Sequence, residues 1–193
     1  RRQRQMCIRD SRGGDAVKKK MKISAAIITK NSELTIIRVL DSLSFADEIV
    51  VVDSGSIDAT VSIAKKYGAK IYYKKWQGYA KQKNYAISKC RGKWILSVDS
   101  DEAVSRELAA EIVKTADSGC CAGYFLPIKD YSYGGKWMRF GGLYPNLQLR
   151  LFKNGSGIFE EALVHECVSV KGKTGVMKHP LFHYTKDSIH SHI

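Results

Sequence analysis

Acidic and polar side chains follow the apolar runs of this sequence, at the points where strands of a sheet would end. Asp99 and Asp101 stand two positions apart, directly after the run 94–98. Thr29 and Asp53 end two earlier runs. Two carboxylates at this spacing can both approach Mg²⁺ or Mn²⁺, which take one or two protein carboxylates and complete their shells with water and phosphate oxygens. The alternative is a solvated turn that caps the next helix, so the position after an apolar run is what favours a metal site.

Two phosphate-binding motifs are absent from the sequence. No Gly-x-Gly-x-x-Gly follows the first apolar run, and no Gly-x-x-x-x-Gly-Lys-Ser/Thr occurs anywhere. These motifs cradle phosphates with backbone N–H groups at a helix start. A nucleotide bound by this chain would therefore need base and ribose contacts, with a metal ion on its phosphates.

The elements that must position these residues alternate between strand and helix. Strands are expected at 23–29, 48–53, 70–73 and 94–98, and helices after the caps Asn31 or Ser32, Asp58 and Ser105 and over 79–90. This alternation predicts an α/β fold with a mostly parallel sheet flanked by helices. Ligands of such sheets bind outside the carboxyl ends of the strands, where the polar residues above would meet.

The remaining sequence divides into a mixed second half and an atypical beginning. From about residue 119, short strand patterns alternate with Gly- and aromatic-rich loops, which indicates an α+β extension packed on the first half (21–118) within a single domain, 21–193. Residues 1–20 are polar and aperiodic, so we expect a disordered basic tail that is not native, with the natural protein starting at Met21. In the first helix, Leu34, Ile37, Leu40 and Leu43 recur every three residues and predict its buried stripe.

Composition and charge restrict the class of protein. The 193 residues are 44% hydrophobic and 26% charged, as in a globular domain, and no apolar run is long enough to span a membrane. The net charge of +13 suggests a module that binds nucleic acid or an anionic surface, but eight of the basic side chains lie in the first twenty residues. The five cysteines form no Cys-x-x-Cys pair, which favours a reduced, cytoplasmic chain.

Several ordered motifs together resemble the inverting family-2 glycosyltransferases. The matching segments are 27–31 (IITKN), 47–58 (DEIVVVDSGSID), 78–84 (GYAKQKN), 94–102 (WILSVDSDE), 149–153 (LRLFK) and 164–166 (VHE). Within that family the sequence is most similar to bacterial lipopolysaccharide-core β-glucosyltransferases. The resemblance implies the GT-A (nucleotide-diphospho-sugar transferase) fold, a nucleotide-sugar donor and Mg²⁺ or Mn²⁺. It also leads us to expect that the chain stops before the family pattern ends.

The resemblance implies roles for particular residues. Thr29, Asn31 and Glu33 would line the nucleotide pocket, and Asp53 would hold the base or ribose. Lys83 and Asn84 would face the donor diphosphate and sugar, although a solvated helix face is an equal alternative for both. Asp99 and Asp101 would hold the metal and the donor. Arg150 could stabilise the departing diphosphate, or form a structural ion pair instead. His183 is a further candidate for contacting the metal or phosphate.

Inverting transfer also needs a carboxylate base that takes the proton of the acceptor hydroxyl. The resemblance points to Glu166, while Glu160, Glu161 and Asp130 are alternatives by residue type. The aromatic stretch 131–144 suits a lid over the acceptor, and it suits core packing or a membrane-surface contact equally well.

Taken together, these patterns predict a metal-dependent inverting glycosyltransferase. It would transfer glucose from UDP-glucose to a lipopolysaccharide-core or related cell-envelope glycan or glycolipid, in the cytoplasm or peripherally at the cytoplasmic face of the inner membrane. The alternatives are a sugar-phosphate nucleotidyltransferase, which needs a Gly-rich phosphate loop that 29–33 lacks, and the basic binding module. We expect no nucleic-acid partner.

Overall fold

The computed structural model describes residues 22–132, 136–137, 144–161 and 167–184. The first half contains the strands β1 (Ile23–Thr29), β2 (Glu48–Asp53), β3 (Lys70–Tyr73), β4 (Trp94–Asp99) and β5 (Glu102–Val104), and the helices α1 (Glu33–Ser42), α2 (Thr60–Lys66), α3 (Tyr79–Lys89) and α4 (Arg106–Ser118). The second half contains β6 (Gly123–Ser132), β7 (Lys136–Trp137), β8 (Asn146–Lys153), β9 (Gly157–Glu160), β10 (Cys167–Val170), β11 (Thr174–Val176) and β12 (Leu181–Tyr184).

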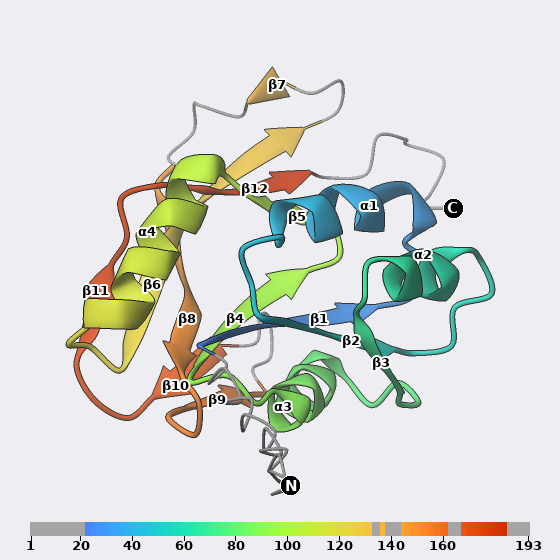
Figure 1. Ribbon diagram of the computed structural model, residues 1–193, viewed down its shortest axis with the longest axis horizontal. Helices are drawn as coiled ribbons and strands as arrows, with labels where there is room; N and C mark the ends of the chain where they lie inside the picture. The colour runs from blue at the N-terminus through green and yellow to red at the C-terminus, as the bar shows by residue number, and fades with distance from the viewer. Residues whose placement is uncertain (1–21, 133–135, 138–143, 162–166, 185–193) are drawn as a thin grey trace, which may run out of the picture.

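One ten-stranded sheet runs through both halves (Figure 1). Its order is β3-β2-β1-β4-β8-β6-β12-β5, with β7 and β11 paired to β6, while β9 and β10 form a separate pair. The strands β3, β2, β1 and β4 are mutually parallel, and β8 runs antiparallel to both β4 and β6. This mixed α/β architecture confirms the expected fold class.

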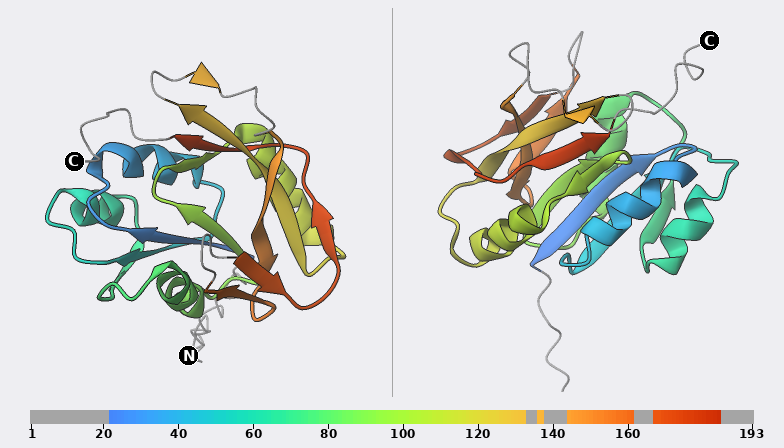
Figure 2. Two further views of the ribbon diagram at one scale, coloured as in Figure 1. Left: turned by 180° about the vertical axis from the view of Figure 1, so that it is seen from behind. Right: turned by 90° about the horizontal axis from the view of Figure 1, so that it is seen from above.

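Helices cover both faces of the parallel part of the sheet. Along β1, Ile23, Ala25 and Ile27 pack in the cluster that contains the buried residues of α1, α2 and α4. Ala26 and Ile28 point to the other face, where α3 and β9 cover the sheet. Figure 1 shows α3 across the strands from α1 and α2, and Figure 2 shows α4, α1 and α2 along one side of the sheet. Because both faces of β1 are buried, all seven of its residues are buried.

The buried stripe of α1 differs from the one expected. Ile36, Val39, Leu40 and Leu43 are buried, whereas Leu34 is 91% exposed and Ile37 is 45% exposed. A strict spacing of three drifts around a helix, because one turn takes about 3.6 residues. The stripe that faces the sheet therefore follows the steps of three, one and three between Ile36 and Leu43.

The register of the parallel strands brings their carboxyl ends to one level. Thr29 pairs with Asp53 of β2, and Ile28 pairs with Asp99 of β4. On the far side of β4, β12 lies between β5 and β6, so that His183 pairs with Glu102 on one strand and Asp130 on the other. Residues distant in sequence thus meet at the same edge of the sheet.

Candidate functional site

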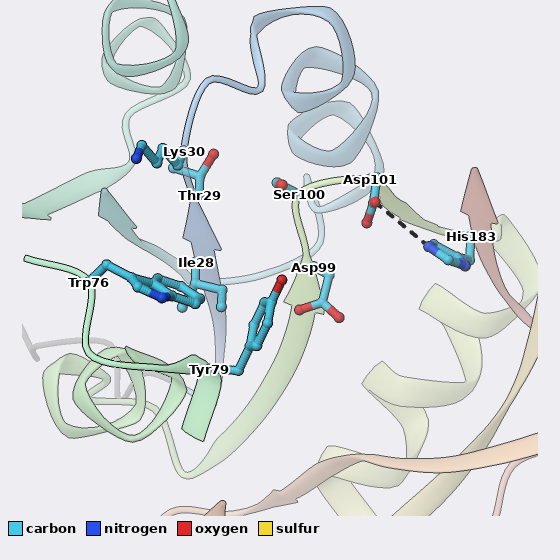
Figure 3. Close-up of a pocket in the computed structure, with 9 residues that line it drawn as sticks. All are labelled: Ile28, Thr29, Lys30, Trp76, Tyr79, Asp99, Ser100, Asp101 and His183. Atoms are coloured by element: carbon cyan, nitrogen blue, oxygen red, sulfur yellow. Dashed lines mark ion pairs between the residues drawn. The ribbon is translucent and has the colours of Figure 1, made fainter. Parts of the chain in front are cut away.

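A pocket of about 480 Å³ opens at the carboxyl ends of β1 and β4 (Figure 3). Its lining residues are Ile28, Thr29, Lys30, Trp76, Tyr79, Asp99, Ser100, Asp101 and His183. They come from the end of β1, from the segment between β3 and α3 with the first residue of α3, from the end of β4 and the turn after it, and from β12. The pocket therefore combines an acidic end on β4 and β12 with an aromatic end before α3.

Asp99 lies in a cluster of alternating charges behind the pocket. Lys83 Nζ lies 2.9 Å from Asp99 Oδ1, and Arg150 Nη2 donates a hydrogen bond of 3.0 Å to Asp99 Oδ2. Arg150 Nη2 also donates to Glu102 Oε1 at 2.7 Å. Lys83, Arg150 and Glu102 are all buried, so these pairs are strongly shielded from water. Lys83 and Arg150 thereby fix the position of the Asp99 carboxylate at the wall of the pocket.

The two carboxyl groups of this cluster have opposite pKa shifts. Burial alone would raise the pKa of Asp99, but the charges of Arg150 and Lys83 outweigh it and hold this pKa well below its ordinary value. Burial raises the pKa of Glu102 to about 7 against the opposing charge of Arg150, and the negative charge of Asp99 adds to the rise. Asp99 is therefore ionised at neutral pH, while Glu102 is the carboxyl group of the cluster that accepts a proton more readily.

Asp101 faces His183 across the acidic end of the pocket. His183 Nε2 lies 3.6 Å from Asp101 Oδ2, and His183 Nδ1 lies 2.7 Å from Asp130 Oδ1 (Figure 3 draws the first pair). The nearby Asp101 carboxylate raises the pKa of His183 to about 9. Burial acts in the opposite direction, and the hydrogen bond to Asp130 adds a smaller rise. The imidazole is therefore protonated at neutral pH and is held between two carboxylates.

The side chains at the acidic end could hold a divalent cation only if a bound substrate supplies further oxygen ligands. Within the part of the chain that the structure describes, no three His, Cys, Asp or Glu side chains converge as a metal site. Mg²⁺, however, is typically held by one or two carboxylates plus substrate phosphates. Asp101 is one such carboxylate, and His183 could join it after losing its proton. Asp99 contacts Lys83 and Arg150 in this arrangement.

Two residues that the resemblance assigns to the nucleotide pocket, Asn31 and Glu33, contact the loop between β2 and α2. Asn31 Oδ1 accepts from the Ile57 N–H, and Glu33 Oε2 accepts from the Ala59 N–H. In the other direction, the Asp58 carboxylate in that loop accepts a hydrogen bond of 3.1 Å from the Glu33 N–H. Asp58 thus acts at the start of α1 as well as near the start of α2, where it also accepts from the Thr60 N–H. Neither Asn31 nor Glu33 lines the pocket.

Asp53 and Asn84 also have partners within the protein. The Asp53 carboxylate accepts hydrogen bonds from the N–H groups of Gly55 and Ser56, which closes the turn after β2. Asn84 donates to the Phe159 carbonyl and accepts from the Phe159 N–H, so it anchors β9 on α3. Of the residues assigned to the nucleotide and metal, the pocket brings together Thr29, Asp99 and Asp101. Lys83 and Arg150 contact Asp99 from behind.

Glu166 lies outside the described residues. Of the alternative bases, Asp130 contacts His183 and Glu161 forms an exposed ion pair of 3.3 Å with Lys81. Of the aromatic stretch 131–144, residues 133–135 and 138–143 also lie outside the described part. The role of Glu166 as base therefore stays a prediction.

Sequence reasoning missed Glu102, Trp76 and Tyr79. Glu102 adjoins the Asp-Ser-Asp motif, but its burial depends on the pairing of β5 with β12. Trp76 and Tyr79 lie close to Gly78, the start of the 78–84 motif. Their proximity to this motif is the feature of the sequence that could have identified them as site residues.

The sheet order, the pocket and its acidic end define the class as a GT-A fold with a site at the carboxyl edge. The chain can be superposed on the crystal structure of Staphylococcus aureus TarS residues 1–349 with a TM-score of 0.61, at 21% identity over 85% of this chain and 60% of that one. The family model for glycosyl transferase family 2 matches residues 24–169. The chain therefore belongs to glycosyl transferase family 2, as its motifs indicated.

Two curated relatives illustrate the range of similarity. The lipopolysaccharide core biosynthesis glycosyltransferase LpsC of Rhizobium meliloti is 31% identical over 169 residues, 81% of this chain and 60% of LpsC. An uncharacterized glycosyltransferase of Rickettsia conorii is 50% identical over 92 residues, 47% of this chain and 33% of the relative. The chain thus spans between a third and 60% of the length of these relatives.

Proposed function

We propose that this protein is an inverting glycosyltransferase that uses a nucleotide-diphosphate sugar, with UDP-glucose as the donor, to extend a lipopolysaccharide-core glycan. The observation that carries the proposal is the pocket at the ends of β1 and β4, where Asp101 lies beside a fixed Asp99 in a chain of this family. The similarity to LpsC supports a cell-envelope acceptor. A lipid-linked acceptor would bring the enzyme to the inner membrane, and none of the described helices is long and apolar enough to cross it.

The reaction would be a single displacement at the anomeric carbon of the donor sugar. The acceptor oxygen forms the new bond while the bond to the diphosphate breaks, and the diphosphate leaves with the electron pair. A bound Mg²⁺ or Mn²⁺ would supply neutralisation of the diphosphate charge. Asp101 would hold the cation, with His183 beside it, and Asp99 would orient donor groups from the position fixed by Lys83 and Arg150.

The proton of the acceptor hydroxyl must pass to a base. We assign this role to Glu166, on the motif alone. A general base typically contributes about 10²- to 10⁴-fold to the rate. Glu166→Gln should therefore lower transfer by this order and leave donor binding unchanged. The same loss in Glu160→Gln instead would assign the role of base to that alternative.

The test is a transfer assay on the whole chain with labelled UDP-glucose and isolated lipopolysaccharide-core oligosaccharide. The proposal expects a β-linked product, identified by NMR, that forms with Mn²⁺ and is lost with EDTA. Formation of an α-linked product would overturn the inverting mechanism. A nucleotide sugar made from a sugar phosphate and UTP would instead support the nucleotidyltransferase.

A further inference from the structure

The end of the pocket away from the acidic groups is aromatic. Trp76 and Tyr79 line it with their rings 4.8 Å apart at an interplanar angle of 89°. Their side chains remain 44% and 58% exposed, although both are large aromatic residues. Figure 3 shows the Trp76 ring beside Ile28 and the Tyr79 ring between Trp76 and Asp99 in that view. An exposed aromatic face in a pocket is available to stack on a flat ligand.

The local fold holds these two rings in place before any ligand binds. Gly78 lies between them, directly before α3, with a φ of +98°, a backbone conformation that favours glycine. The buried Gln82 donates through Nε2 to the Lys74 carbonyl at 2.9 Å and to Ser54 Oγ at 2.8 Å. Gln82 therefore ties the segment before Trp76 to α3 and to the end of β2. A rigid aromatic wall loses little entropy when it binds.

The arrangement of the strands indicates how a nucleotide-sugar donor would be oriented in the pocket. The acidic end adjoins β4 and β12, and the second half of the chain begins beyond β4 in the sheet. The aromatic end lies on the other side, at the end of β1 and in the chain that follows β3. If the diphosphate lies at Asp101 and the acceptor on the side of the second half, the base must extend past Thr29 toward Trp76.

From these observations we propose that Trp76 is the stacking face for the base of the nucleotide donor, with Tyr79 bracing the edge of the Trp76 ring. This assignment rests on the proposed function, because it takes a nucleoside diphosphate as the ligand. If the assignment is correct, Trp76 contributes to the affinity for the base and does not contribute to the affinity for the diphosphate.

The experiment compares UDP with inorganic pyrophosphate, both with Mn²⁺, by calorimetry on the whole chain. Because stacking of a base on an aromatic side chain contributes to affinity, Trp76→Leu should weaken UDP binding by about 5- to 150-fold. Pyrophosphate binding should not change, and Trp76→Phe should keep most of the UDP affinity. Tyr67→Leu is the control, since Tyr67 is a half-exposed aromatic residue that lines a different pocket.

A second readout uses the intrinsic fluorescence of the chain, which contains three tryptophans. UDP should quench the wild-type signal and leave that of Trp76→Phe almost unchanged. Unchanged UDP affinity in Trp76→Leu, or an equal loss of UDP and pyrophosphate in a folded variant, would overturn the assignment and leave the proposed function standing. A wild type that binds no nucleoside diphosphate would overturn both.

Discussion

At the residue scale, the site depends on charges that hold one another in place. Arg150 is buried and bonds to both Asp99 and Glu102, so it sets the position of one carboxylate at the pocket wall and neutralises another behind it. Removing one partner of such a buried pair leaves an uncompensated charge. The cluster is thus part of the stability of the fold as well as of the site.

Arg150→Met should therefore lower the free energy of unfolding by about 3 kcal/mol, measured by urea denaturation at pH 7. The matched control is Lys81→Met, which breaks the ion pair with Glu161 whose side chains are 60% and 64% exposed. That change should cost less than about 1 kcal/mol, because solvent screens exposed pairs. Equal stability of Arg150→Met and the wild type would show that the buried cluster contributes no net stabilisation.

The sequence predicted that Asp101 lies in the site, whereas it offered His183 only as a further candidate, and the difference has a physical reason. The position of Asp101 follows from the strand immediately before it. That of His183 depends on β12 entering the sheet between β5 and β6, a pairing across some fifty to eighty residues that no local pattern encodes. Asn31, Asp53 and Asn84 hydrogen-bond to backbone groups of the protein, which residue type and motif do not reveal. Their assignment to the nucleotide stays a prediction.

At the scale of elements, the apolar runs of the parallel strands were predictable, including the four-residue β3, whereas the three-residue β5 was not. β1, β2 and β4 are buried on both faces, and burial leaves a continuous apolar signal in the sequence. β5 has three residues and exists because β12 pairs with it. The stripe of α1 shows the same limit, since spacing alone did not distinguish the face toward the sheet from the face toward solvent.

Two substitutions in α1 test this packing directly. Ile36→Ala removes a fully buried side chain and should lower the free energy of unfolding by about 2–5 kcal/mol. Leu34→Ala, on a side chain that is 91% exposed, should change it by less than about 0.5 kcal/mol. Chemical denaturation of both variants gives the comparison. The reverse order of effects would mean that α1 packs through the stripe expected from the sequence.

Glu48 links several elements at the opposite edge of the sheet from the pocket. Its buried carboxylate accepts from Ser24 Oγ of β1, from Lys70 Nζ of β3 and from the Arg91 N–H before β4. Burial would raise the pKa of Glu48, but these hydrogen bonds outweigh it and lower the pKa below its ordinary value. The ionised form is therefore stabilised by folding.

This contribution is present above the ordinary glutamate pKa and is lost as the pH falls through the lowered value. Glu48→Gln should be about 1–3 kcal/mol less stable than the wild type at pH 7. Urea denaturation should show the difference shrinking below about pH 4, as the wild-type carboxylate takes up its proton. A difference that stays constant with pH would contradict a role for the charge of Glu48.

At the scale of the whole molecule, one sheet carries both sides of the site. The parallel strands supply Thr29, Asp99 and Asp101, and β12 of the second half supplies His183. The family and the fold could be recognised from motifs that lie mostly in the first half. For the second half the sequence predicted an α+β extension with short strands but not the order of these strands, because they pair out of sequence order.

The most direct test of the central claim is a calorimetric titration of UDP-glucose into the whole chain, with Mn²⁺ and then with EDTA. We expect binding that requires Mn²⁺ and is lost in Asp101→Ala. Asp117→Ala should behave like the wild type, since Asp117 is an exposed aspartate paired with Lys22. Binding that persists in EDTA and in Asp101→Ala would contradict the role of the acidic end. A folded chain that binds neither UDP-glucose nor any other nucleotide sugar would contradict the assignment of this pocket as a donor site.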